Sequence, residues 1–583
     1  METTTELSEY HVEILKDFLN DFQLSSTFSS TNNVSEKFKY QQLILKRLSI
    51  ITNALRSCYQ EDFRIANNEC AIKFCKLLSK NQLILAQYLI HNDNFIVYLT
   101  KKLLTLWLLF ISNEKPIVDN INIEEIQRQL FKKICDLYND KLKDMSSSAT
   151  IESVLEIFHC ILKDFRHCLS EVIDEDAENI LSQHAGCRLL NVLNEQFKVE
   201  QITNIADTSN NLIIVPILTV ILDIKKLEIY EIEVALDSYL VKIFQSFLEK
   251  VDSKIESICV LLCCGYLPAI RKVLNILYHT VKSTSNIDMI FTILTSIRDY
   301  TGQILAASDV QKLNGCPTLD NDYTEFFDRQ KDNNKVVSNV SINIECTKKL
   351  IDIYMEVYTN IMKLLMENNI NMIGINISAD IKLRILTNIF SFSHELLQNE
   401  NSVEYLFNWY TNNDSDLTFF MLNFVRLELT FREFKKKLIN FDGESQKRTI
   451  KSVMESVSLQ MNHILNHFTS HDFFLRFLIS TGFNHSILLD FIISNETNFL
   501  EFLLKYCKYL EQDISQFFII CKKFDKKNSE MENCAEQVLG VFNCLIQSIQ
   551  SLMEKKLFPY NATSLIKRLK KVELCLKEVI YNN

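Results

Sequence analysis

Apolar residues recur along most of this chain at intervals of three and four residues, a spacing that gathers them on one face of an α-helix. The pattern predicts helices over several segments: Gln41–Ala54, Glu152–Phe165, Val234–Leu248, Ile287–Ile297 and Ile385–Leu397. Short polar clusters predict the breaks between helices: Ser25–Ser35, Met145–Thr150, Asp207–Asn211, Asn368–Asp380 and Asn440–Gln446. The sequence shows no convincing example of the glycine-bounded, β-branched runs that mark strands.

The shortage of turn-forming residues supports an all-α fold. The 583 residues include eight glycines and five prolines, whereas ordinary proteins carry roughly 7% glycine and 5% proline. Hairpins and β-crossovers depend on both residues, while Asn, Ser and Asp can cap and turn helices without them. A single core stops growing at roughly 250–300 residues. We therefore predict an armadillo/HEAT-like α-solenoid or an irregular helical array, with negligible β-structure.

The predicted organisation has five parts. Residues 1–36 form an N-terminal helix and a flexible connector, and residues 37–305 form a first helical array. Residues 306–338 hold Gly315, Pro317 and many Asn and Asp residues, which predicts a long loop. A second helical array covers 339–525, and C-terminal helices cover 526–583.

The net charge, the cysteines and the apolar runs bear on which partners and which compartment the protein has. The net charge of −11 makes nucleic acid an unlikely partner. The 17 cysteines are scattered without a CxxC motif, which favours reduced thiols inside the cell over a disulfide framework or a zinc site. No secretory signal opens the chain, and its longest apolar runs are too short to span a bilayer: Leu103–Ile111, Leu212–Leu222 and Ile258–Ile270. No membrane association is expected.

The spacing of the glycines excludes several kinds of active site. No two of them lie within ten residues of each other. The dinucleotide fingerprint, the P-loop, the kinase glycine loop and the GxSxG elbow all need paired glycines. HExxH is absent as well, and Asp320-x-Asp322 lacks the glycine that an EF-hand loop requires. We predict no catalytic residues, no cofactor and no metal site.

Three histidines have a spacing that metal ligands on a helix could have. His463, His467 and His471 lie four residues apart and would stack on one face of a helix. The sequence after His467 predicts that one helix ends and another begins with Ser470 as its N-cap, which takes His471 off that face. We therefore favour structural histidines on the surface, with a metal site as the alternative.

Two basic clusters interrupt the acidic background. Arg432–Lys451 contains seven Lys or Arg residues against three acids, and Lys555–Asn583 contains seven against two. Solvated helix faces account for both clusters, and a nuclear import signal or a site for an acidic partner is the alternative. Direct nucleic-acid binding is disfavoured because neither cluster interleaves aromatic residues.

The last predicted helix follows Phe558-Pro559-Tyr560, with Asn561 or Thr563 as its cap. Its apolar stripe either closes the end of the array or binds a partner. We select six residues of this block as candidate partner-binding residues: Phe558, Tyr560, Lys567, Arg568, Lys570 and Lys571. Phe558 and Tyr560 are also candidates for core anchors, and we favour that role for them.

Two blocks of this region resemble the Lines family. One is GFNHSILLDFIISNETNFLEFLLKYCKYLEQDISQFFIICKKFD over Gly482–Asp525, and the other is KKLFPYNATSLIKRLKKVE over Lys555–Glu573. The chain departs from the family pattern at Ala562, where relatives often have proline. It also departs at the short link Lys526–Cys534, where some vertebrate relatives carry a long insertion.

The resemblance implies a regulator that moves between the cytoplasm and the nucleus in developmental patterning and Wnt-type signalling. In insects, such proteins antagonise zinc-finger transcription factors of the odd-skipped type. The family offers no catalytic residues to carry over. We therefore expect a non-enzymatic scaffold that binds proteins and regulates transcription factors, with a transport receptor or assembly platform as the alternative. An enzyme of unfamiliar type would need a buried polar pocket with several perturbed acids or histidines.

Overall fold

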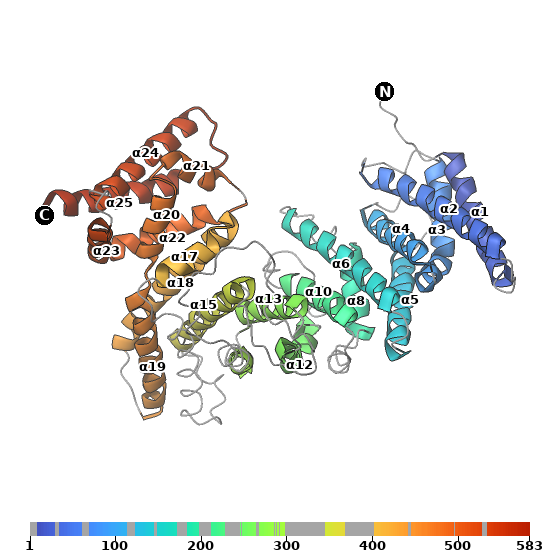
Figure 1. Ribbon diagram of the computed structural model, residues 1–583, viewed down its shortest axis with the longest axis horizontal. Helices are drawn as coiled ribbons and strands as arrows, with labels where there is room; N and C mark the ends of the chain where they lie inside the picture. Colours follow the sequence, from blue (N-terminus) through green and yellow to red (C-terminus); the bar gives the residue numbers. More distant parts are fainter. Residues whose placement is uncertain are drawn as a thin grey trace, which may run out of the picture. The chain divides into compact units, whose positions relative to one another are not determined.

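The computed structural model of the chain is built from helices (Figure 1). It describes residues 8–28, 34–60, 69–91, 93–113, 123–144, 148–171, 184–196, 211–227, 245–246, 248–263, 267–284, 286, 288–290, 292–297, 344–367, 402–440, 445–494, 496–527 and 533–582. No strand occurs among these residues. The all-α prediction is therefore confirmed. The chain divides into two compact units, Met1–Ser283 and Thr284–Asn583.

The described part of unit 1 consists of α-helices and two short 3₁₀ turns, η2 (Tyr88–Ile90) and η3 (Leu261–Cys263). Its helices are α1 (Glu9–Phe28), α2 (Val34–Gln60), α3 (Glu69–Gln87), α4 (Asn94–Asn113), α5 (Ile123–Asp144), α6 (Ser148–Glu171), α8 (Ala185–Gln196), α10 (Asn211–Leu227), α12 (Ile255–Val260) and α13 (Leu267–Ser283).

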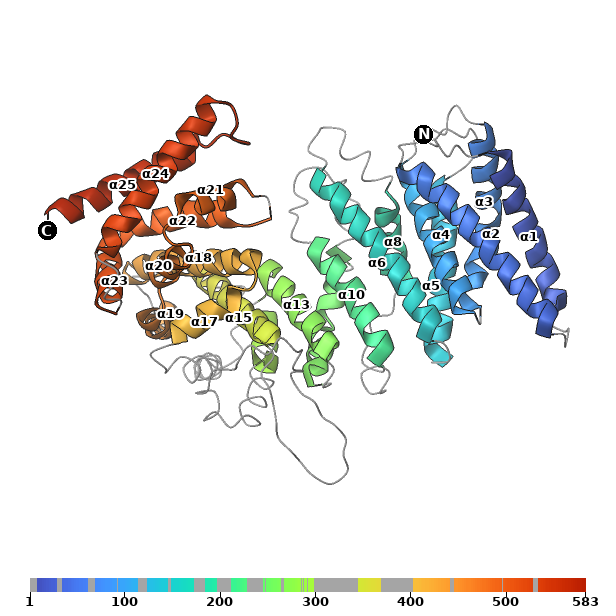
Figure 2. The ribbon, with the colours of Figure 1, turned by 45° about the horizontal axis from the view of Figure 1, so that its top comes forward.

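The helices of unit 1 stack in two rows. In one row α2 packs on α4, α4 on α6, α6 on α10 and α10 on α13; in the other α1 packs on α3, α3 on α5 and α5 on α8. Figure 2 shows the first row side by side. Each helix thus covers the apolar face of the next one in its row, as helical-repeat arrays do. A repeated solenoid unit in the strict sense stays a prediction.

Buried side chains tie the two rows together. Trp107 of α4 is 1% exposed, and its indole N–H donates to Gln82 of α3 over 3.4 Å. The Gln82 amide donates in turn to the carbonyl oxygen of Ile126 in α5 over 2.9 Å. The run around Trp107, which the sequence assigned to a core helix, lies in α4 with Leu103, Leu104 and Leu108 fully buried. None of the helices in the described part of the chain is long and apolar enough to cross a membrane.

Unit 2 contains ten described helices. They are α15 (Ile344–Met366), α17 (Ser402–Tyr410), α18 (Asp414–Ile439), α19 (Ser445–His467), α20 (Ser470–Ser480), α21 (His485–Ile493), α22 (Phe499–Gln512), α23 (Ile514–Lys527), α24 (Cys534–Glu554) and α25 (Thr563–Asn582). Four of them pack in series, since α15 contacts α18, α18 contacts α22 and α22 contacts α25. The remaining helices pack against this series, with α24 on α25 and α20 on α18.

Aromatic rings fill the interior of unit 2. Phe420 of α18 stacks on Tyr410 of α17 at 4.4 Å between ring centroids and meets Phe473 of α20 edge-on at 5.0 Å. Phe474, on the same helix as Phe473, lies 4.2 Å from the ring of Tyr506 in α22. Such rings remove a large apolar area from water and fix the orientation of the helices that carry them.

The periodicity predicted several of these helices correctly. Gln41–Ala54 lies inside α2 and Glu152–Phe165 inside α6, while the breaks at Met145–Thr150 and Asn440–Gln446 coincide with helix ends. Ile385–Leu397, the predicted loop 306–338 and most of Val234–Leu248 lie outside the described residues.

One glycine in unit 1 is required by close packing. Gly186 lies in the first turn of α8, and a Cβ added there would lie 2.4 Å from Cγ of Phe165 in α6. Phe165 is 2% exposed, so it has little room to move away.

We therefore expect Gly186→Ala to destabilise the protein by about 1–3 kcal/mol through overpacking. A lower urea midpoint in circular dichroism would register the change. Gly540→Ala in α24 is the matched control, because a Cβ there meets nothing within 4 Å. That substitution replaces a helical glycine and should stabilise by about 0.5–1 kcal/mol. Equal midpoints for the two variants would contradict the packing argument.

Candidate protein-interaction surface

The turn between α24 and α25 is fixed by its backbone and by two aromatic residues. The N–H groups of Lys556 and Leu557 donate to the carbonyls of Met553 and Leu552 over 3.0 and 2.8 Å, which forms a Schellman-type end for α24. Lys556 itself adopts the left-handed conformation, with φ of 56°.

Beyond this turn, the hydroxyl of Tyr560 donates to the carbonyl oxygen of Ile492 at the end of α21. Phe558 packs edge-on against Tyr560 with centroids 4.9 Å apart. Burial raises the pKa of Tyr560. Asn561 then accepts the backbone N–H of Thr563 over 3.0 Å and caps α25. The aromatic pair therefore anchors the turn within unit 2.

One face of α25 is buried against α22 and α24. It carries Leu565, Leu569, Val572 and Leu576, none of them more than 2% exposed. The predicted apolar stripe thus closes this end of the helix series.

A single carboxylate reinforces the contact between α25 and α22. Glu511 of α22 is 9% exposed and accepts two hydrogen bonds from Arg568, of 3.0 and 3.2 Å, and one of 2.7 Å from Lys571. Charge-assisted hydrogen bonds of this kind are stronger than neutral ones. Two of the four cations selected from the sequence are thereby engaged inside the unit.

The opposite face of α25 is exposed. Lys567 and Lys570 point away from the core, and neither forms an ion pair with any described residue. Leu574 and Tyr581 lie along the same face and are 61% and 75% exposed. We call the surface made by Lys567, Lys570, Leu574 and Tyr581 the outer face of α25.

A buried polar cluster holds the helices behind this surface together. Glu428 of α18 is 2% exposed and accepts hydrogen bonds from the backbone N–H of Ser470 over 3.1 Å and from the hydroxyl of Tyr509 over 2.9 Å. Burial raises the pKa of Glu428 to about 8, although these hydrogen bonds oppose the rise. The cluster therefore joins α18, α20 and α22.

His471 extends the cluster on α20. It is fully buried, and its Nδ1 shares a 3.1 Å hydrogen bond with the hydroxyl of Tyr506. Burial lowers the pKa of His471, although nearby Asp513 opposes the change. Asp513 also pairs with Arg432, whose guanidinium lies 4.2 Å from the centre of the Tyr509 ring. Most of these groups have hydrogen-bond partners within the interior, as buried polar groups do in stable folds, but Nε2 of His471 lies 3.8 Å from Asp513 and has no hydrogen-bond partner among the described residues.

The histidine prediction was right about the helix break and wrong about His471. Helix α19 ends at His467 and α20 begins at Ser470, so the three imidazoles do not share a face. The N-cap is Thr469, one residue before the predicted one, and its hydroxyl accepts the N–H of Asp472 over 3.2 Å. His463 and His467 are exposed, whereas His471 lies in the core.

The cations of the first basic cluster, Arg432–Lys451, do not all lie exposed on one surface, because some of them contact other helices. Arg432 pairs with Asp513, and Lys437 donates to the carbonyl oxygen of Met366 over 2.9 Å, at the C-terminal end of α15. The side chains of Lys447 and Arg448 lie outside the described residues. Arg432 and Lys437 therefore serve helix packing.

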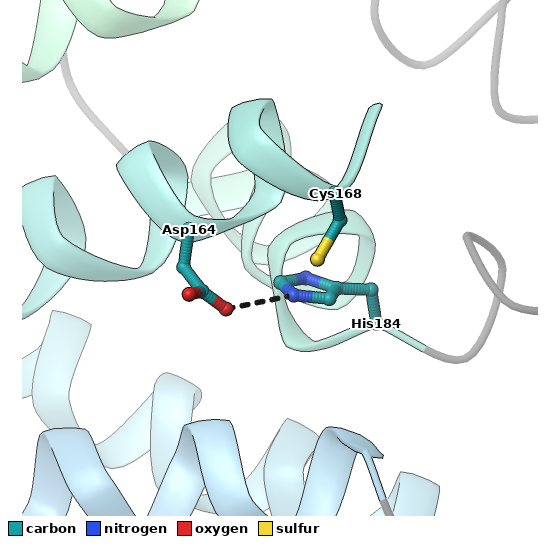
Figure 3. Close-up of side chains that lie close together, drawn as sticks. All are labelled: Asp164, Cys168 and His184. Carbon is teal, nitrogen blue, oxygen red and sulfur yellow. Dashed lines mark hydrogen bonds and ion pairs between the residues drawn. The ribbon is translucent and has the colours of Figure 1, made fainter. Parts of the chain in front are cut away.

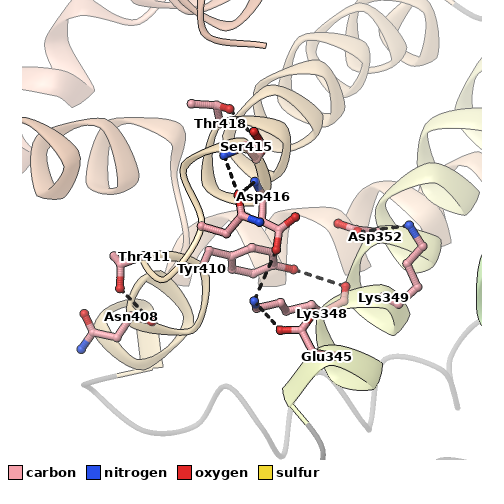
Figure 4. A network of polar contacts seen from close by, with 11 residues as sticks. Glu345, Lys348, Lys349, Asp352, Asn408, Tyr410, Thr411, Ser415, Asp416 and Thr418 are labelled. Carbon is pink, nitrogen blue, oxygen red and sulfur yellow. Dashed lines mark hydrogen bonds and ion pairs between the residues drawn. The ribbon is translucent and has the colours of Figure 1, made fainter. Parts of the chain in front are cut away.

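A second polar network joins α15, α17 and α18 (Figure 4). Lys348, 6% exposed, lies 2.8 Å from a carboxylate oxygen of Glu345 and 3.6 Å from one of Asp416. Tyr410 donates to the carbonyl oxygen of Lys348 over 3.2 Å. Burial raises the pKa of nearby Asp352 to about 7. This network fixes the ends of three helices.

One group of side chains in unit 1 has the composition of a metal site. The ligand atoms of Asp164, Cys168 and His184 all lie within 4.8 Å of one another (Figure 3). However, Nδ1 of His184 accepts the N–H of Gly186 over 2.9 Å, so the ring proton resides on Nε2 and points to Asp164 at 3.2 Å. A metal-binding histidine instead offers a bare nitrogen to the ion and donates from the other one. The group fits a cap for α8 better than a metal centre.

Family models match unit 2. The model described as Lines N-terminus covers residues 344–521, and the model described as Lines C-terminus covers residues 538–574. Unit 2 thus carries both segments of the Lines family. The resemblance seen in Gly482–Asp525 and Lys555–Glu573 is thereby confirmed. Both the buried cluster around Glu428 and most of the outer face of α25 lie inside the matched segments.

Individual relatives agree with this assignment. Protein Lines homolog 1 of Homo sapiens is 34% identical over 99 residues, which is 17% of this chain and 12% of the human protein. Protein Lines homolog 1 of Mus musculus is 47% identical over 60 residues, 10% of this chain and 8% of that protein. Protein lines of Drosophila melanogaster is 31% identical over 100 residues, 17% of this chain and 11% of the fly protein. The aligned segments therefore span only a small share of these relatives.

Sequence reasoning missed the buried acids of this Lines protein. Glu428 stands in Leu427-Glu428-Leu429, on the apolar side of its helix, and Glu511 follows the apolar run of α22. A carboxylate at an apolar position of a helical stripe was the signal available for Glu428.

The raised pKa of Glu428 predicts a pH dependence of stability. The ordinary pKa of this group is 4.5 and its folded value is about 8, so its contribution is complete below about pH 4.5 and is lost as the pH rises through 8. Glu428→Gln keeps the shape without the charge. We expect the variant to gain stability relative to wild type between pH 5 and 8.5, on the order of a few kcal/mol.

Urea denaturation of both proteins at pH 5, 7 and 8.5 measures this difference. The lowered pKa of His471 destabilises the fold at acidic pH, but it is present in both proteins and cancels. A difference that stays constant across the three pH values would show that Glu428 does not titrate in this range.

Removing the carboxylate of Glu511 should loosen α25. Glu511→Gln leaves Arg568 and Lys571 without their shared anion, at an expected cost of about 1–3 kcal/mol. Amide hydrogen exchange should accelerate in α25 while the core of α18 stays protected. Glu501→Gln is the control, because its partner Arg426 joins α22 to α18 instead. Equal exchange in α25 for both variants would exclude Glu511 as its anchor.

Proposed function

We propose that this Lines protein is a regulator that acts by binding other proteins and has no catalytic activity of its own. Its partners are proposed to be transcription regulators, zinc-finger factors among them, in developmental signalling of the Wnt type. The cytoplasm and the nucleus are the proposed locations. The support for this function comes from family membership together with the surface chemistry of unit 2.

The observation that carries the proposal is the outer face of α25. Exposed apolar side chains beside unpaired cations are typical of surfaces that bind partners. Leu574 and Tyr581 supply the apolar area, and Lys567 and Lys570 supply the charge. Of the six residues selected from the sequence, Lys567 and Lys570 remain the best candidates for contact, since Tyr560, Arg568 and Lys571 have partners within the unit.

The buried acids and histidine do not give an equally good case for an enzyme. Glu428 and His471 are buried at 2% and 0% exposure, and their polar neighbours are other side chains and the backbone. A catalytic group must reach a substrate. A role in helix packing accounts for their hydrogen bonds and their burial together.

A transport receptor or assembly platform is the second candidate. The two-row stacking of unit 1 favours it, because stacked helices present extended surfaces to large partners. The identity of the co-purifying proteins separates the two functions: transcription regulators support the first, and transport or assembly components support the second.

The test compares full-length proteins in cultured animal cells. Lys567→Glu/Lys570→Glu should abolish or strongly reduce capture of the partners, because it reverses the free charge without touching the core. Lys76→Glu/Lys80→Glu on α3 is the control, since it makes the same charge change at exposed positions of unit 1. Truncation at Lys555 is less informative, because it would strip buried Leu565 and Leu569 from the core.

Affinity purification followed by mass spectrometry gives the readout, and circular dichroism confirms that all three proteins are folded. Partners lost from the α25 variant and retained by the α3 variant would support the proposal. An unchanged set of partners in both variants would remove the outer face of α25 from the binding surface.

A further inference from the structure

Helix α25 ends a series of packed helices in unit 2. Both α18 and α22 contact a neighbour of the series on each side, since α15, α18, α22 and α25 follow one another. Helix α25 contacts α22 and α24, and within the described part of the chain nothing covers its outer face. The position that a next helix would take in the series is therefore open on this face.

The residues of that face repeat at the spacing of a helical stripe. Lys567, Lys570, Leu574 and Tyr581 are separated by three, four and seven residues, which aligns them along one side of α25. Leu574 and Tyr581, at 61% and 75% exposure, leave most of their side chains in water. A stripe of this kind matches the contact face of a second helix.

The charges along the stripe are asymmetric. Its N-terminal half carries Lys567 and Lys570, and exposed Lys555 and Lys556 lie at the turn that precedes α25. Exposed Leu557 lies at the same turn and is 67% accessible. The C-terminal half carries Leu574 and Tyr581, and its charged residues are Glu578 and Lys577, which pairs with Glu573 on the same helix. A complementary partner therefore needs acidic residues at one end and apolar residues at the other.

We propose that the outer face of α25 binds a single amphipathic helix of a protein partner, with acidic side chains against Lys567 and Lys570 and apolar side chains against Leu574 and Tyr581. The proposal rests on the protein-binding function proposed above and specifies its partner. The bound helix takes the next place in the series α15, α18, α22 and α25. Helices pack in this way at interaxial distances of about 8–10 Å.

The same lysines could in principle attract a nucleic acid, but the rest of the face argues for a protein helix. Leu574 gains nothing from contact with phosphate, and Glu578 repels it. The net charge of −11 adds a repulsive background for any polyanion. An amphipathic helix satisfies the cations and covers the exposed apolar side chains together.

A designed peptide tests the proposal directly. The probe is a fluorescent helix of about 18 residues with glutamates in one half and a leucine stripe at helical spacing in the other. Two control peptides are matched to it: one has lysine in place of each glutamate, and one has the same composition with the stripe scrambled. Fluorescence anisotropy with the full-length protein measures each dissociation constant.

We expect the acidic helix to bind and both control peptides to bind at least about tenfold more weakly, the factor that roughly 1.4 kcal/mol of lost interaction produces. The Lys567→Glu/Lys570→Glu protein should bind the acidic helix about tenfold or more weakly than the wild type does. It should bind the lysine peptide instead. Leu574→Ser/Tyr581→Ser should weaken binding without reversing this preference. Lys76→Glu/Lys80→Glu should leave all three constants unchanged.

Three outcomes would overturn the inference. Equal binding of the scrambled peptide would show that charge alone is recognised. Tighter binding of duplex DNA with the same dependence on Lys567 and Lys570 would assign the face to nucleic acid. If the Lys567→Glu/Lys570→Glu protein does not bind the lysine peptide, the acidic peptide binds the wild-type protein at another surface.

The outcomes also separate this inference from the proposed function. If cellular partners depend on Lys567 and Lys570 but the acidic helix neither binds nor competes with them, the function stands and the helical occupant is wrong. If the acidic helix binds while no cellular partner depends on these lysines, the helix site stands and the proposed function is wrong.

Discussion

Every helix of this protein has an apolar face that must be covered, and the neighbouring helix is what covers it. With eight glycines and five prolines in 583 residues, the chain has few means of building sheets or glycine-rich loops. Its apolar surface is removed from water by stacking helix on helix instead. The two rows of unit 1 and the series α15, α18, α22 and α25 of unit 2 follow from that requirement.

Stacking by apolar contact alone would allow helices to slide or rotate, and the buried polar groups restrict this freedom. Glu428 is bonded to the backbone of Ser470 and to Tyr509, so a shift of α18 along α20 or α22 would leave a buried carboxyl without partners. An unsatisfied buried group costs about 1–3 kcal/mol or more. We regard the cluster around Glu428 as a determinant of helix register more than of total stability.

The sequence predicted what depends on local spacing and missed what depends on contacts between distant segments. Apolar periodicity located helices such as α2 and α6, and the end of α19 near His467 was visible as a capping signal. The burial of His471 could not be derived from its neighbours, because Tyr506 and Tyr509, which surround it, lie more than 30 residues away. Likewise, nothing near Arg568 indicates that Glu511, 57 residues earlier, has already engaged its charge.

The scarcity of glycine also shapes the ends of the helices. Gly482 supplies the left-handed residue after α20, but Phe483, Asn533 and Lys556 adopt positive φ values without glycine's freedom. A left-handed conformation costs an ordinary L-residue roughly 1–2 kcal/mol, whereas asparagine adopts it more readily, so Phe483 and Lys556 are the two residues that their surroundings hold against their own preference. At Lys556 the conformation is held by the following turn, in which Phe558 packs on Tyr560 and Tyr560 donates a hydrogen bond to Ile492 of α21. A substitution of Tyr560 would therefore change the direction in which α25 extends from the turn.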